Sequence, residues 1–313
     1  MRAVLTAALL TVAGAVFAQT NATPGPKIIN LTDEFVEAYD RNANKSEADF
    51  VKDFRASVEP AFPQFYGIDR YAGKKTREQR DKEIGDAFKE FPSLRSAYVD
   101  KSNAFATELP KHIATFVKHF PDYKPSTIYL VHTLGEMDGG QRTLSGKVHF
   151  IFGPDAMVKY HAPGARVAPF FHHELFHDYR SLKCEGGKIW THLWVEGLAT
   201  YVAKTLTPDA SIPELSLNIP ENMVPGVRAA PRQAWTDLKA RLDDGRGPSY
   251  ENLFRNIPDN TGLPARRGYY LGFLVAQEVS KKYSLQQVAQ LGCEQVRQEV
   301  HEAVDKLTDR PIH

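Results

Sequence analysis

The segment Phe171-His172-His173-Glu174-Leu175-Phe176-His177-Asp178 contains the pattern His-Glu-x-x-His. In a helix, residues four positions apart lie on the same face, so the imidazoles of His173 and His177 can converge on one metal ion. Glu174 lies beside them, where its carboxylate can act on a water at the metal rather than on the metal itself. The pattern therefore predicts a metal-binding helix over about 170–182.

Two histidines leave a catalytic zinc site short of one ligand, because such sites use three protein ligands and one open position. One known arrangement places glycine three and histidine six residues after the second histidine, but Arg180 and Lys183 occupy these positions. Another arrangement places a glutamate on a following helix about twenty residues further on. Glu196 stands nineteen residues after His177 and is the predicted third ligand.

The residues around Glu196 support a second helix, over about 191–206. Gly197 and Ala199 are small, as expected where this helix packs tightly on the histidine helix. His192, four residues before Glu196, is a competing ligand in principle, but an ordinary polar role is the expected one. The predicted metal ligands are therefore His173, His177 and Glu196.

The composition limits the other classes of function. The chain has 313 residues, with 39 Lys and Arg against 38 Asp and Glu, 11 His and two Cys. This balance, without a basic cluster, argues against a nucleic-acid partner. Two cysteines cannot form an all-cysteine zinc site, so histidine and carboxylate must hold any metal.

The amino-terminal residues predict export. Residues 1–18 have one basic residue, an apolar stretch and small or aliphatic residues before Gln19, which is typical of a signal peptide cleaved after Ala18. We expect a flexible leader over 19–30, a helical region over 31–125 and a region over 126–313 that carries the metal motif. Export permits a disulfide between Cys184 and Cys293, although two buried free thiols are equally compatible with the sequence. No membrane span is expected after cleavage.

The periodicity of apolar residues predicts a mostly helical α+β fold. Strands are expected at 126–132 and 147–152, joined as a hairpin by the glycine-rich segment 135–146. Further helices are expected at 231–243, 265–282, 284–291 and 293–307, and a long loop at 208–231.

His173-Glu-x-x-His177, eighteen residues and then Glu196-Gly-x-Ala resemble the gluzincin zinc metallopeptidases, in particular the aminopeptidase-N-like superfamily. Trp194 stands one residue closer to the glutamate than in the Trp-x-x-Glu-Gly-x-Ala pattern of that group. The chain is also similar to bacterial predicted zinc-dependent proteases of uncharacterised substrate, and the resemblance covers about 147–283 with gaps. It implies that 126–313 is a zincin-like metallopeptidase region that binds one Zn²⁺ ion.

The resemblance also implies an oxyanion-stabilising tyrosine in a Tyr-x-x-Gly motif that opens a later helix. Tyr269 fits the motif with Gly272, and Tyr270 is the alternative. A tyrosine that only packs in the core remains open, because aromatic residues usually pack.

Three other expectations concern the surroundings of the site. The family's Gly-x-Met-Glu-Asn motif, which binds a substrate amino terminus, is absent: the segment 135–139 reads Gly-Glu-Met-Asp-Gly, so exopeptidase activity is not implied. The strand at 147–152 is the candidate edge strand that pairs with an extended substrate. Asp178 or Thr200 could orient the histidines. Arg266 and Arg267, just before Tyr269, could face a carboxylate or phosphate of a substrate, but a solvated helix start is the expected arrangement.

We therefore expect a secreted or periplasmic zinc peptidase that acts on peptide or protein substrates. Glu174 would transfer the proton and Tyr269 would stabilise the oxyanion. The alternatives are a zinc hydrolase of esters or non-peptide amides, and a zinc-binding protein without activity. The sequence does not predict the substrate preference, internal or terminal cleavage, or the oligomeric state.

Overall fold

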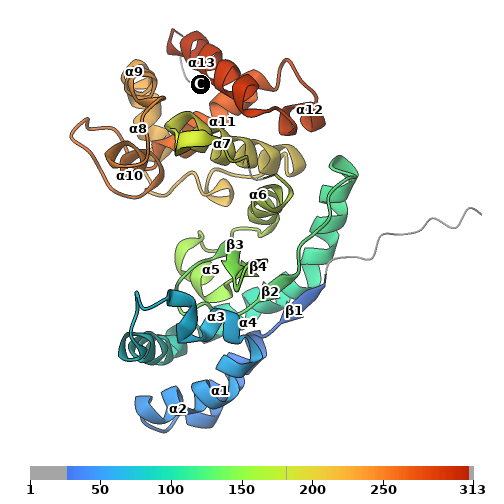
Figure 1. Cartoon of the computed structure of the whole chain (residues 1–313), viewed down its shortest axis with the longest axis vertical. Coiled ribbons are helices and arrows are strands. Elements are labelled where there is room, and N and C mark those ends of the chain that lie inside the picture. Colours follow the sequence, from blue (N-terminus) through green and yellow to red (C-terminus); the bar gives the residue numbers. More distant parts are fainter. Residues whose placement is uncertain (1–26, 181, 310–313) are drawn as a thin grey trace, which may run out of the picture.

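The computed structural model describes residues 27–180 and 182–309, which form a mostly helical molecule around one small sheet (Figure 1). The predicted α+β class is confirmed. The predicted signal peptide, residues 1–18, and most of the expected leader lie outside the described residues. No helix in the described ranges combines the length and the apolar character needed to cross a membrane.

The sheet has four strands in the order β1-β2-β4-β3. These are β1 (Ile28–Asn30), β2 (Ile128–Leu130), β3 (Gly139–Leu144) and β4 (Lys147–Phe152). β1 is parallel to β2, with Ile28 opposite Ile128, and β2 is parallel to β4, with Ile128 opposite Phe150. Since β1 includes residues 28–30, the expected flexible leader over 19–30 is wrong at its end.

The predicted hairpin between the strands at 126–132 and 147–152 is wrong. The turn lies between β3 and β4, which pair antiparallel with Gly139 opposite Phe152, whereas β2 and β4 are parallel. The glycine-rich segment expected as a connection therefore contains an edge strand, and β4 is an interior strand. The ladder with β4 satisfies those backbone groups of β3 that face β4, which compensates for the weak strand preference of its two glycines.

The amino-terminal helices form a first core with one face of the sheet. They are α1 (Thr32–Asn42), α2 (Glu47–Ser57), α3 (Pro63–Tyr66) and the long α4 (Arg77–His119). Capping boxes at Ser46 and Thr76 fix the starts of α2 and α4. Half of the buried residues of the first core are aromatic, among them Phe35, Phe54 and Phe91.

The second core contains the remaining helices, most of which lie at the end of Figure 1 opposite α1 and α2. They are α5 (Pro154–Tyr160), α6 (Ala168–Tyr179), α7 (Ile189–Leu206), α8 (Met223–Ala229), α9 (Pro231–Arg241), α10 (Pro248–Phe254), α11 (Arg267–Val279), α12 (Leu285–Ala289) and α13 (Cys293–Thr308). The long loop expected over 208–231 is wrong in part, because it contains α8. Met223, Val224 and Val227 of α8 are buried in this core.

Helix α4 belongs to both cores. Its residues Phe91 and Tyr98 pack in the first core, whereas Phe105, Leu109 and Phe116 pack in the second. The two cores therefore do not follow the expected division of the chain at residue 125.

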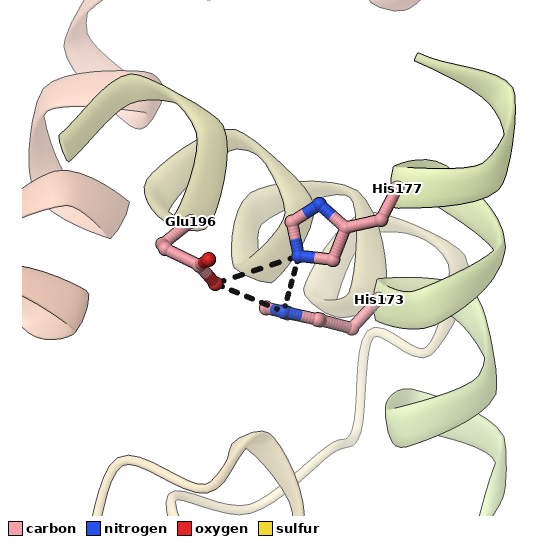
Figure 2. Close-up of side chains that lie close together, drawn as sticks. All are labelled: His173, His177 and Glu196. Atoms are coloured by element: carbon pink, nitrogen blue, oxygen red, sulfur yellow. Dashed lines mark hydrogen bonds and ion pairs between the residues drawn. The ribbon is translucent and has the colours of Figure 1, made fainter. Parts of the chain in front are cut away.

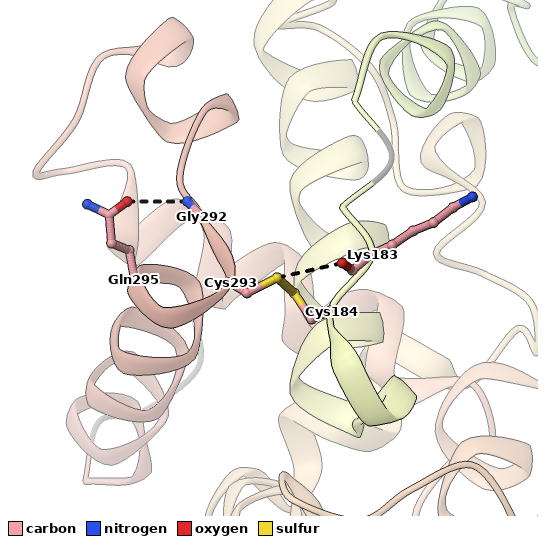
Figure 3. The surroundings of a disulfide bond; sticks show 5 residues. All are labelled: Lys183, Cys184, Gly292, Cys293 and Gln295. Atoms are coloured by element: carbon pink, nitrogen blue, oxygen red, sulfur yellow. Dashed lines mark hydrogen bonds between the residues drawn. A yellow bond between two sulfur atoms is a disulfide. The ribbon is translucent and has the colours of Figure 1, made fainter.

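A disulfide joins Cys184, in the connection between α6 and α7, to Cys293 at the start of α13 (Figure 3). The Cα atoms are 5.7 Å apart, which is a normal separation for this bond. Next to it, the side chain of Gln295 accepts a hydrogen bond from the backbone N–H of Gly292 at 3.2 Å and caps α13. The disulfide thus links α13 to the segment between α6 and α7.

Replacing both cysteines with serine should lower the free energy of unfolding by about 2–5 kcal/mol, because the bond closes a loop with a sequence separation of 109. Urea denaturation followed by circular dichroism measures this change. Wild-type protein kept in a reducing agent is the control and should match the double variant. Equal stability of the oxidised wild type and the variant would contradict the structural role of this bond.

Candidate metal centre

Two crossing helices bring the three predicted ligands together (Figure 2). His173 and His177 lie one turn apart on α6, and Glu196 reaches them from α7. Phe171, Leu175 and other apolar residues of α6 are buried, which leaves the two half-buried histidines on the opposite side of the helix. The apolar face of α6 therefore fixes the direction in which the imidazoles point.

The spacing of the ligand atoms suits a single ion. The Nε2 atoms of His173 and His177 are 3.0 Å apart, and an oxygen of Glu196 is 3.4 Å from each of them. Ligand atoms around a tetrahedral ion with bonds of 2.0–2.1 Å are separated by about 3.3 Å. His173, His177 and Glu196 can therefore hold a metal ion, and two imidazoles with one carboxylate are a ligand set that zinc accepts.

His192 is not part of this group. Its ring packs against Tyr250 and Phe254, and its Nε2 atom lies 3.3 Å from the Nε atom of Arg246. Its expected polar role is consistent with these contacts.

The charges at the site favour a cation. Burial would raise the pKa of Glu196, but the two neighbouring histidines hold it well below its usual range. Burial would lower the pKa of His177, but the carboxylate of Glu196 raises it to about 9. Glu196 therefore stays ionised. Without metal, a proton on His177 balances this negative charge, and an incoming cation would replace that proton.

Glu174 lies in the same cleft but outside the ligand group. Burial raises the pKa of its carboxyl group, and the two histidines offset part of this rise. Gly140 of β3 faces it: a β-carbon at Gly140 would stand 3.4 Å from a Glu174 oxygen, and the φ of 128° suits glycine. A carboxyl group with a raised pKa beside a metal site is suited to take up and release a proton.

The cleft around these residues has a volume of about 380 Å³. β3 forms one wall through Gly139, Gly140 and Gln141. The strand expected to face a substrate, 147–152, is instead the interior strand β4, so this expectation is wrong. Sequence reasoning missed β3, although two adjacent glycines beside a strand signal a close approach of the backbone to another group.

The structure separates the two candidate tyrosines. Tyr269, near the start of α11, lines the cleft, whereas Tyr270 is 2% exposed and its hydroxyl accepts a hydrogen bond from Arg228 at 3.1 Å. Burial raises the pKa of Tyr269 well above its usual range, so its hydroxyl remains a hydrogen-bond donor. Tyr269 is therefore the tyrosine that can reach a bound substrate.

Two glycines set the distance between α7 and α11. A β-carbon at Gly197 would lie 2.2 Å from the carbonyl carbon of Gly272, and one at Gly272 would lie 2.5 Å from the carbonyl oxygen of Leu193. The expectation that Gly197 packs on the histidine helix is wrong, because it packs on α11. This close crossing brings Tyr269 to the same cleft as Glu196.

The two expected orienting residues behave differently. Asp178 does not bind a histidine: its carboxylate accepts hydrogen bonds from Tyr123, Ser126 and Gln141. Asp178 thus ties α6 to the cleft strand β3. The hydroxyl of Thr200 lies 3.5 Å from Nδ1 of His173 and donates to the backbone oxygen of Glu196 at 2.8 Å.

The expectation of a solvated helix start at Arg266 and Arg267 is wrong. Arg267 is fully buried and pairs with Asp237 and Asp259, each at 2.7 Å. Arg266 lines the cleft, half-buried, with its guanidinium 4.7 Å from the centre of the Tyr269 ring. The sequence alone could not separate these adjacent arginines, because their directions depend on the turn that precedes α11.

Comparisons of the chain with protein-family models, with curated proteins and with solved structures found no match.

Proposed function

We propose that this protein is a zinc-dependent peptidase that is exported to the periplasm or secreted. One observation carries the proposal: the group of His173, His177 and Glu196 opens into the cleft that also holds Glu174. A purely structural metal site has no use for a carboxylate that does not bind the metal.

Zinc held by these three residues would act as a Lewis acid that polarises a carbonyl group and lowers the pKa of water. A carboxylate oxygen of Glu174 takes the proton of the attacking water and then delivers it to the leaving amine. The hydroxyl of Tyr269 donates a hydrogen bond to the oxygen of the carbonyl as negative charge develops there. Each of these groups lines the same cleft.

The position of β3 favours a peptide over a small ester. β3 pairs with β4 along one edge and is the last strand of the sheet, so its other edge is available to an extended chain. Its residues Gly139, Gly140 and Gln141 line the cleft beside Glu174. Backbone hydrogen bonds to such an edge bind an extended peptide independently of its side chains.

The decisive experiment combines metal analysis with digestion of a peptide library. We expect about one zinc per chain, cleavage of peptides rather than esters, and loss of both zinc and cleavage in His173→Ala. Full zinc occupancy in that variant would refute the ligand set. Cleavage of esters but not peptides would instead support the alternative hydrolase, and bound zinc without any hydrolysis would support the inactive metal-binding protein.

Replacing Tyr269 with phenylalanine should lower kcat about 10²–10³-fold and leave the zinc content unchanged, because it removes one donor to the oxyanion. Steady-state kinetics on a peptide found in the library measures the effect. Tyr270→Phe is the matched control: it removes a hydroxyl that bonds to Arg228 outside the cleft, and it should lower kcat far less. Equal effects of the two changes would show that Tyr269 only packs.

A further inference from the structure

The cleft contains more negative than positive side chains, yet most of its carboxylates already have partners. Asp138 lies 3.0 Å from the imidazole of His161, and this partner keeps the pKa of Asp138 low although burial opposes it. Glu214 lies 2.6 Å from the guanidinium of Arg166. Glu196 belongs to the metal group, so Glu174 is the remaining lining carboxylate.

Arg266 is the one lysine or arginine among the described residues that line the cleft. None of the four lining carboxylates forms an ion pair with it. Its described contacts are with Tyr269: its guanidinium lies 4.7 Å from the centre of the ring, and the two side chains are hydrogen-bonded. A guanidinium has five N–H donors, so these contacts with Tyr269 leave donors of Arg266 for a ligand.

The backbone holds Arg266 in this place. Its φ of 58° lies in the left-handed region, which costs free energy for a residue with a β-carbon. Arg267, the next residue, is anchored by two buried ion pairs, and the backbone N–H of Arg266 donates to the carbonyl of Asn252 at 2.9 Å. These contacts hold the backbone of the turn before α11 in place at Arg266. A ligand that binds the Arg266 side chain therefore does not have to order this turn, which reduces the entropy lost on binding.

We propose that Arg266 binds a carboxylate of the substrate next to the scissile bond, so that the enzyme prefers peptides carrying a negative charge there. This inference rests on the proposed peptidase function. Tyr269 is placed at the reacting carbonyl in that function, and the guanidinium lies against its ring. The carboxylate is therefore either the carboxyl terminus of the peptide or the side chain of Asp or Glu in a residue adjacent to the bond.

The test compares pairs of peptides that differ only in this charge. One pair has Glu or Gln beside the cleaved bond, and the other has a free or an amidated carboxyl terminus. For the wild type we expect kcat/KM to be about 10- to 100-fold higher for the charged member of one pair, mainly through KM. The pair that shows the preference identifies the source of the carboxylate.

Variants of Arg266 test whether this residue causes the preference for the charged peptide. In Arg266→Gln the ratio of kcat/KM within the pair should fall to about one, and Arg266→Lys should restore part of it; both keep a β-carbon at the strained position. Using the ratio cancels any effect of the variant on Tyr269. Arg232→Gln, which changes an exposed arginine of α9 outside the cleft, is the control and should keep the wild-type ratio.

Binding gives a second measurement that does not need turnover. In the Glu174→Gln protein, the same charged peptide should bind about 10- to 100-fold more tightly than its neutral partner, and Arg266→Gln should remove this difference. Cleavage of both members of each pair at equal rates would overturn the inference and leave the peptidase function intact. A preference that survives in Arg266→Gln would also overturn it, whereas no cleavage of any peptide would contradict the proposed function itself.

Discussion

Replacing Glu174 with glutamine should lower kcat for peptide hydrolysis about 10²–10⁴-fold, with no loss of zinc. The amide has nearly the same shape as the carboxylate but cannot take up the proton of water. Glu174 is outside the metal group, so the ligands His173, His177 and Glu196 are unchanged. Kinetics on a cleaved library peptide, together with zinc analysis of the same sample, tests both halves of this prediction.

Glu221→Gln provides the matched control for the Glu174 variant. Glu221 is exposed and does not line the cleft, so its amide should leave kcat at the wild-type value. If the Glu174→Gln protein kept more than about a tenth of the wild-type kcat, this would contradict the role of Glu174 as the proton-transferring group.

Replacing Gly197 with alanine should strongly destabilise the protein. The added β-carbon would stand 2.2 Å from the backbone of Gly272, where no side chain can move aside. We expect the free energy of unfolding to fall by about 1–3 kcal/mol, even though alanine is about 1 kcal/mol better than glycine in a helix. Because α11 must shift away from α7, kcat should fall as well, since Tyr269 moves away from Glu196.

Gly85→Ala is the control for Gly197→Ala. It shows the effect of a glycine-to-alanine change in a helix without a collision with backbone atoms. Gly85 is also a buried helical glycine, but the group that its β-carbon would meet is the side chain of Glu47, which can rotate away. The free energy of unfolding of the Gly85→Ala protein should stay unchanged or rise slightly. Urea denaturation of both variants measures the difference, and equal stabilities would contradict the close contact of α7 and α11.

The predictions that depended on helical spacing agree with the structure. Residues four apart on α6 must share a face, whereas Glu196 was predicted from the spacing of a known zinc-binding arrangement. Both helices form close to the expected bounds, at Ala168–Tyr179 and Ile189–Leu206. Helical spacing was sufficient for the two histidines, whereas the contact with Glu196 between two helices followed from the known arrangement and not from local rules.

The predictions that failed depended on partners distant in the sequence. Gly139 and Gly140 become part of a strand only because β4 pairs with them. In the sequence, Arg267 resembles an ordinary surface arginine, but in the structure it is buried and pairs with Asp237 and Asp259. Neither outcome follows from the residues near these positions, because the pairing groups come from other elements of the fold.

The 43 residues of α4 have a consequence for anyone who wishes to produce the metal-binding half by itself. A fragment beginning at residue 126 would lack Phe105, Leu109 and Phe116, which fill the core beneath α6. A fragment beginning at residue 77 would include them but would expose Phe91 and Tyr98, which otherwise pack against α1. Neither a start at residue 77 nor one at residue 126 therefore leaves a complete folding unit around the metal-binding motif.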